Sequence, residues 1–168
     1  MAQAFDNALQ ADGELLTSSS DAGVFVYQPD KSVGPPVNIG AFKYMEITVL
    51  KIRPGHGQDW DELAKLHDSI FSKAPNAGWA MYEKWFGTGS EDEYIALHAM
   101  RSLAEIDETR VANKKIWAAV SADQKKKVAD LEASTFESIQ SNLFVFDPKM
   151  SYVSDKWRSA DPGFWGQQ

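Results

Sequence analysis

The sequence predicts an α+β domain whose elements follow the order β-α-β-β-α-β. Alternating β-branched and aromatic residues indicate strands at residues 44–53, 79–86 and 93–100. A helical apolar stripe separates the first two strands, and a longer helical region separates the third from a fourth strand at residues 142–148. This order is the split βαβ, or ferredoxin-like, topology, in which helices cover one face of an antiparallel sheet.

The first strand ends at Pro54-Gly55, and a helix follows. Its apolar positions recur with helical spacing and form a single stripe: Trp60, Leu63, Ala64, His67, Ile70 and Phe71. A breaker run at residues 74–78 ends this helix. The turn Gly87-Thr88-Gly89-Ser90 then joins the second and third strands into a hairpin.

Two capping-box patterns predict two helices after the hairpin, or one helix broken near Val120. The patterns are Ser102 with Glu105 and Ser121 with Gln124. We expect the second helix to continue through Phe136 and Ile139 before the fourth strand begins.

The chain ends suggest three segments. A helix is expected at residues 2–16 and a short strand at residues 23–29. Residues 25–32 align with residues 144–151, and a helical pattern precedes both. We therefore expect an N-terminal helix-strand segment (1–40) that resembles the end of a preceding repeat and pairs at a sheet edge, a ferredoxin-like module (41–153), and an aromatic C-terminal tail (154–168) that packs on the body.

Composition excludes several functional classes. The 168-residue chain has a formal net charge of -7, which argues against nucleic acid as a partner. It contains no cysteine, so it has no disulfide, thiolate nucleophile or Cys-ligated metal, and the compartment is left open. No apolar run approaches the roughly 20 residues that span a bilayer, and residues 1–10 lack an apolar signal core. We expect a soluble chain with no membrane partner, of unknown localisation.

Alternation sorts the strands of the central stretch into two faces. The aliphatic face contains Met45, Ile47, Val49, Ala80, Tyr82, Ile95, Leu97 and Ala99. The mixed face contains Tyr44, Glu46, Thr48, Leu50, Trp79, Met81, Glu83, Trp85, Tyr94, Ala96, His98 and Met100. We expect the aliphatic face to lie under the helices, and the mixed face to meet a partner sheet, a cavity or both, in a protein that is at least a dimer.

Three runs carry a family resemblance: KYMEITVLKIRPGHGQDWDEL, RSLAEID and SNLFVFDPKMSYVS. They resemble the dimeric α+β barrel superfamily, which includes antibiotic biosynthesis monooxygenase-like (ABM-like) domains, and more narrowly the second module of uncharacterised two-module bacterial proteins. The resemblance covers roughly residues 41–165, and it implies two sheets facing each other in a homodimeric barrel with helices outside. Its members include monooxygenases, haem-binding and haem-degrading enzymes, ring isomerases and proteins of no known activity. No catalytic signature of a characterised branch matches, so enzyme status stays open, and haem enters by analogy only because no axial-ligand motif is present.

The candidate catalytic residues are His98, Glu83 and Glu46. His98 and Glu83 are expected on neighbouring strands of the mixed face, where a carboxylate could orient an imidazole for proton transfer. Glu46 on the first strand could complete the cluster. The alternative is a buried hydrogen-bonded network at a dimer interface.

The candidate ligand-binding residues are Trp79, Trp85, Tyr94 and His67. The three aromatic rings could stack on a flat apolar ligand or interdigitate with a partner sheet. His67 lies on the apolar stripe of the first helix and could be a ligand contact or a satisfied core histidine, whereas His56 fits a capping or surface position. No motif for a nucleotide, flavin or metal is present.

Two functions follow. The chain could bind, or act on, a small flat apolar or aromatic ligand, with His98 as acid or base. Alternatively, it could be a non-catalytic module that uses the same sheet face for assembly.

Overall fold

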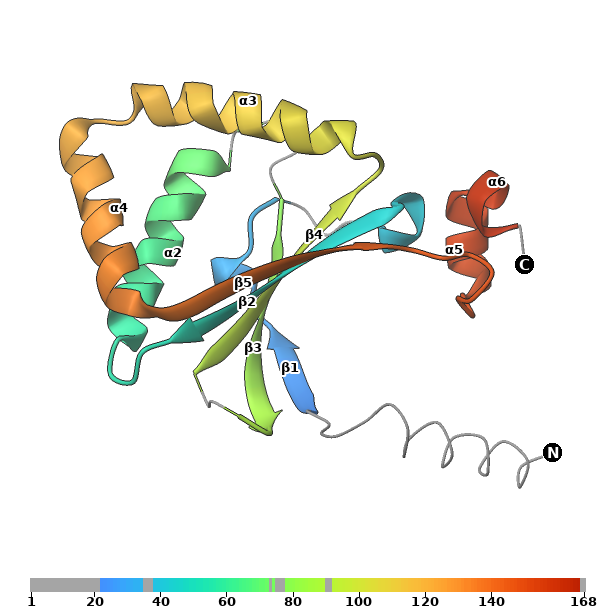
Figure 1. The fold of residues 1–168 in the computed structure, drawn as a ribbon, viewed down its shortest axis with the longest axis horizontal. Coiled ribbons are helices and arrows are strands. Elements are labelled where there is room, and N and C mark those ends of the chain that lie inside the picture. Colours follow the sequence, from blue (N-terminus) through green and yellow to red (C-terminus); the bar gives the residue numbers. More distant parts are fainter. Residues whose placement is uncertain (1–21, 35–37, 73, 75–77, 90–91, 167–168) are drawn as a thin grey trace.

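The computed structural model describes residues 22–34, 38–72, 74, 78–89 and 92–166, and the helix expected at residues 2–16 lies outside them. Five strands form one antiparallel sheet in the order β1-β3-β4-β2-β5 (Figure 1). The strands are β1 (Gly23–Tyr27), β2 (Tyr44–Ile52), β3 (Ala80–Gly87), β4 (Glu93–Met100) and β5 (Phe136–Val145). The predicted α+β class is confirmed.

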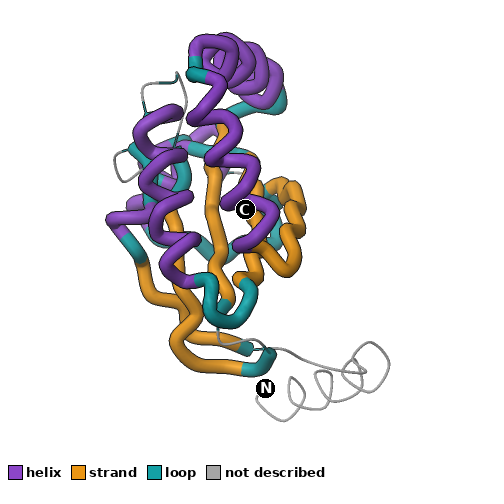
Figure 2. The backbone as a smooth tube through the Cα atoms, turned by 90° about the vertical axis from the view of Figure 1, so that its left-hand side faces the viewer, coloured by secondary structure: helices purple, strands orange, loops and turns teal. Residues whose placement is uncertain are grey.

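Three long helices cover one face of this sheet: α2 (Gly57–Phe71), α3 (Ala104–Ala119) and α4 (Ala122–Thr135). Helices α2 and α4 lie side by side, and α3 crosses above their ends (Figures 1 and 2). The chain breaks between α3 and α4 because Val120 is extended and Ser121 caps the next helix, its Oγ accepting a hydrogen bond from the Gln124 amide at 3.2 Å.

The boundary between α4 and β5 differs from the sequence prediction. Phe136 and Ile139 were expected in the helix, but α4 ends at Thr135 and Phe136 begins β5. Strand β5 pairs with β2 from Phe136 opposite Ile52 to Val145 opposite Tyr44. The nine residue pairs that β5 forms with β2 outweigh a helical periodicity that extended past Thr135 on two apolar positions.

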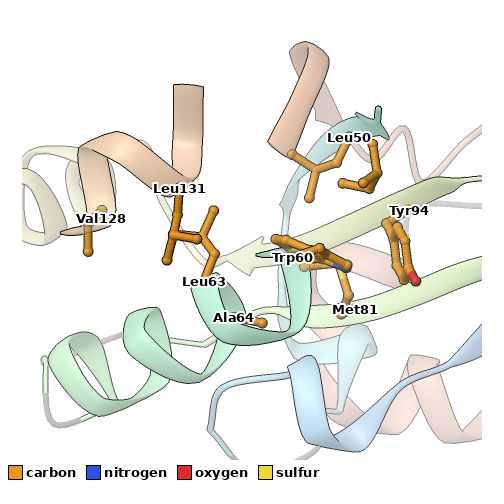
Figure 3. Close-up of a cluster of buried hydrophobic side chains, with 9 residues drawn as sticks. Leu50, Trp60, Leu63, Ala64, Met81, Tyr94, Val128 and Leu131 are labelled. Carbon is orange, nitrogen blue, oxygen red and sulfur yellow. The ribbon is translucent and has the colours of Figure 1, made fainter. Parts of the chain in front are cut away.

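The hydrophobic core identifies which sheet face the helices cover. Buried side chains of the mixed face pack against α2 and α4: Leu50, Met81 and Tyr94 meet Trp60, Leu63, Ala64, Val128 and Leu131 (Figure 3). The expectation that the aliphatic face lies under the helices is therefore wrong. The mixed face holds the longer apolar side chains, which reach the helical stripe, and three of its polar residues, Glu46, Thr48 and His98, line a cavity described below.

The aliphatic face lies on the opposite side of the same strands. Ile47 pairs with Leu97 and Val49 pairs with Ile95, and all four side chains remain half-buried in the single chain. A contiguous apolar sheet face of this kind is unusual on a monomer.

The described segments on both sides of the module, residues 22–34 and 154–166, pack onto it. Strand β1 pairs with β3 at the sheet edge, and the buried Val33 is bridged to Trp79. The short helices α5 (Asp155–Ala160) and α6 (Pro162–Trp165) bring the tail back to η2 (Ile39–Ala41). Trp165 is fully buried, and its Nε1 donates a hydrogen bond to the Gly40 carbonyl at 2.6 Å. The predicted packing of the aromatic tail is confirmed.

Candidate ligand-binding cavity

A cavity of about 510 Å³ lies between the mixed face and the three long helices. Its lining is largely apolar and includes Leu50, Met81, Ala96, Met100, Phe71 and Ile106. The volume falls in the range that small-molecule sites usually have, about 300–1,000 Å³.

His98 and Glu46 form the polar part of the cavity floor. They are directly opposite each other on β4 and β2, and His98 Nδ1 lies 3.6 Å from Glu46 Oε2. The His98 side chain is 22% exposed and that of Glu46 is 41% exposed, so both can reach a ligand. A carboxylate at this distance can orient the imidazole.

Glu83, the other predicted catalytic carboxylate, lies elsewhere on the same face. The sheet register places it opposite Tyr94, four residues along β4 from His98, or about 13 Å at the usual rise per residue. Tyr94 Oη donates to Glu83 Oε1 at 2.9 Å, and Gln28 Nε2 donates to Glu83 Oε2 at 2.8 Å. Burial raises the pKa of the Tyr94 phenol, and Glu83 adds to the effect, so the phenol stays a hydrogen-bond donor.

The four predicted ligand-binding residues separate into two pairs. His67 and Trp79 line the cavity. Tyr94 is a core residue outside the lining, and Trp85 is 59% exposed and also outside it. The structure thus brings together His98, Glu46, His67 and Trp79 and leaves Glu83, Tyr94 and Trp85 in a separate group.

His67 and Trp79 are both anchored by hydrogen-bonding or charged partners. His67 Nε2 lies 3.4 Å from Glu132 Oε1, and Trp79 Nε1 donates to the Lys31 carbonyl at 3.1 Å. Lys31 also lines the cavity, and its Nζ lies 2.8 Å from Asp61 Oδ1. Through Lys31, the short helix η1 (Pro29–Lys31) after β1 contributes to the cavity wall.

Helix α3 supplies lining residues that the sequence interpretation missed. Thr109, Arg110 and Asn113 face the cavity together with Ile106. The sequence does contain a signal for these residues. Positions 106, 109, 113 and 117 share one helical face, and Thr109 and Asn113 are polar residues on that face between the apolar Ile106 and Trp117.

Histidine burial makes the stability of the fold depend on pH. Burial lowers the pKa of His67 below its ordinary value of 6.5, although Glu132 opposes the shift. The unfolded chain therefore binds a proton at His67 more readily than the folded chain does. The stability that neutral His67 contributes is present above pH 6.5, and it is lost as the pH falls through the pKa of His67 in the folded state. We expect the thermal midpoint to fall between about pH 7 and pH 5 in the parent, and to fall less in His67→Gln.

Scanning calorimetry across this pH range measures the effect. Gln58→Ala, which changes an exposed, non-titrating residue of the same helix, is the control. Parallel pH profiles of the parent and His67→Gln would contradict the assignment.

Metal-binding clusters and membrane-spanning helices are both absent from the described residues. No cluster of three or more His, Cys, Asp or Glu side chains there could hold a metal ion. None of the helices in the described part has the length and apolar character needed to cross a bilayer.

Similarity to known proteins is confined to three-dimensional structure. No protein-family model matches the sequence, and no curated protein matches it. An anthrone oxidase-like protein superposes with a TM-score of 0.51 and 16% identity, covering 83% of this chain and 61% of that one. The chain therefore shares an α+β fold with that protein. It spans less than two thirds of the length of that protein, and at this identity the similarity shows fold alone.

Two further structures of lower similarity are NIPSNAP-like. An uncharacterized NIPSNAP-like domain protein from Burkholderia xenovorans has a TM-score of 0.42 and 12% identity, covering 67% of this chain and 91% of that one. A nipsnap family protein with unknown function from Agrobacterium tumefaciens has a TM-score of 0.41 and 13% identity, covering 66% of this chain and 96% of that one.

Proposed function

We propose that this protein binds a small, largely apolar ligand in the cavity between the mixed face and the helices. The observation that carries the proposal is the pairing of His98 with Glu46 on the floor of a cavity of about 510 Å³. Placing an imidazole and a carboxylate beside an apolar surface costs free energy unless each group has a hydrogen-bonding or charged partner. That partner can be the other group of the pair or a bound ligand. The Trp79 ring offers a flat surface for a planar ligand.

The chemistry that this floor supports is proton transfer. In its neutral form His98 accepts a proton from an acidic C–H or O–H group of the ligand, and Glu46 then stabilises the imidazolium. The 3.6 Å separation is longer than a hydrogen bond, and such contacts often tighten when the ligand binds. Glu46 therefore acts as the orienting partner of His98.

The residues that line the cavity do not specifically indicate a haem-binding site. The two imidazoles in the cavity each lie beside a carboxylate, His98 with Glu46 and His67 with Glu132, and neither is marked as an axial ligand. Haem is therefore one test compound among others in the experiment below.

From the sequence, the assembly role is expected on the mixed face, but helices α2 and α4 pack on that face, so an interface between sheets has to use the opposite, aliphatic face. We propose that the aliphatic face, with Ile47, Val49, Ile95 and Leu97, is buried by a second copy of the chain. These side chains are half-buried in the single chain, and the cavity lies on the opposite side of the sheet. Ligand binding and homodimer formation are therefore compatible.

A ligand screen with matched histidine variants tests the function. Planar compounds, haem included, are titrated against the parent, His98→Gln and His56→Gln, and each bound compound is assayed for proton exchange or turnover. We expect His98→Gln to reduce turnover by about 100-fold or more, because general acid–base catalysis contributes about 10²–10⁴-fold, with a smaller effect on binding.

His56→Gln is the control, because His56 lies outside the cavity lining and bonds Asp59 at the start of α2. Unchanged turnover in His98→Gln would remove His98 as the acid or base. Failure of every compound to bind the parent would contradict the binding proposal itself.

A further inference from the structure

Unpaired polar atoms are concentrated in the cavity. Within the described part of the chain, four buried side-chain polar atoms have no hydrogen-bond partner. Three of them, Trp60 Nε1, Thr109 Oγ1 and Asn113 Oδ1, belong to residues that line the cavity, and only Thr135 Oγ1 does not. A buried polar atom without a partner costs free energy, so three in one cavity require an explanation.

Two of these atoms lie on α3, which meets the core only through the partly buried Trp117. Thr109 and Asn113 are four residues apart on α3, one turn above the other on the same face. Helix α3 has no buried residue, whereas α2 and α4 have three each. The inward polar side chains of α3 are therefore not explained by packing, because apolar residues at these positions would cover the cavity at lower cost.

We propose that Thr109 and Asn113 form a hydrogen-bonding subsite that selects and orients the ligand. The subsite lies on the α3 wall of the cavity, whose lining also includes His98 and Glu46 on the sheet. An amide oxygen only accepts, and a hydroxyl both donates and accepts. The chemistry that satisfies both is a neutral group that donates and accepts, such as a hydroxyl or an amide, on an otherwise apolar compound. This inference rests on the proposed binding function.

Isosteric removal of the two α3 oxygens tests the subsite. Thr109→Val and Asn113→Leu, singly and together, keep the side-chain shape and remove the polar atoms. Because the oxygens have no partner in the free protein, we expect the thermal midpoint of the ligand-free double variant to stay equal or rise. Val111→Thr, the reverse exchange at a position of α3 that is 55% exposed, is the matched control and should change neither stability nor binding.

The ligand specificity of the subsite is measured with three naphthalene probes that differ only in the 2-substituent: 2-naphthol, 2-methylnaphthalene and 2-naphthoate. We expect the parent to bind 2-naphthol most tightly, and the double variant to lose about 10-fold in 2-naphthol affinity while its affinity for 2-methylnaphthalene stays within about twofold. Isothermal titration gives both values.

Each alternative result has a distinct meaning. A lower midpoint in the ligand-free variants would show that the oxygens have structural partners and would overturn the subsite. Equal binding of 2-naphthol and 2-methylnaphthalene by the parent, or preference for 2-naphthoate, would overturn it while leaving the binding function in place. Failure of all three probes to bind the parent would count against both.

Discussion

Replacing Trp165 with Ala is expected to lower the free energy of unfolding by about 3–5 kcal/mol, the usual cost of truncating a buried tryptophan. The side chain is fully buried, and its ring meets those of Phe146, Trp157 and Phe164 at centroid distances of 4.8–5.8 Å. Its Nε1 also satisfies the Gly40 carbonyl. The contact depends on close approach, since a Cβ at Gly40 would lie 2.8 Å from the Trp157 Cα.

Urea unfolding of the parent and three variants measures this effect. Trp165→Phe keeps a ring but loses the hydrogen bond, so its loss should be smaller. Tyr152→Ala, at a position that is 99% exposed, is the control and should change little. A loss below about 1 kcal/mol in Trp165→Ala would show that the tail does not stabilise the module.

The second large effect is expected at the aliphatic face. If a second copy covers this face, Leu97→Glu places a charge in an apolar interface and should raise the dimer dissociation constant by at least about 100-fold. Leu97 lies at the centre of the sheet, opposite Ile47 on β2 and Ala80 on β3. Dilution series by analytical ultracentrifugation give the constants.

Ala129→Glu adds the same charge at an exposed position of α4 and should leave the dimer intact. A parent protein that is monomeric at all concentrations, or a dimer that Leu97→Glu does not weaken, would contradict the proposed interface.

The fold was predictable from sequence wherever the signal is local. Alternation and the Gly87–Ser90 turn identified the hairpin strands, and the capping pattern at Ser121 identified the start of α4. Alternation separates two faces without saying which face meets the helices. That choice depends on which side chains fill the space beneath Trp60 and Leu63, and the count of aliphatic residues gave the opposite answer.

The candidate site was predictable only in part, because register is a long-range property. His98 and Glu46 share a face and are also directly paired, whereas Glu83 shares the face but lies opposite Tyr94. Residue pattern cannot distinguish these cases without the strand register. Thr109 and Asn113 could be identified as candidate ligand contacts only from the structure, which shows a cavity beside α3. In sequence they resemble ordinary polar helix residues, which usually face solvent.

The central claim is that the cavity between the mixed face and the helices holds the ligand. The most direct measurement is a crystal structure of the protein with its tightest-binding probe. The account predicts ligand density between His98 on the sheet and Thr109 on α3, with Trp79 at its side. Density on the aliphatic face, or a cavity closed by repacked side chains while the probe lies on the outer surface, would contradict it.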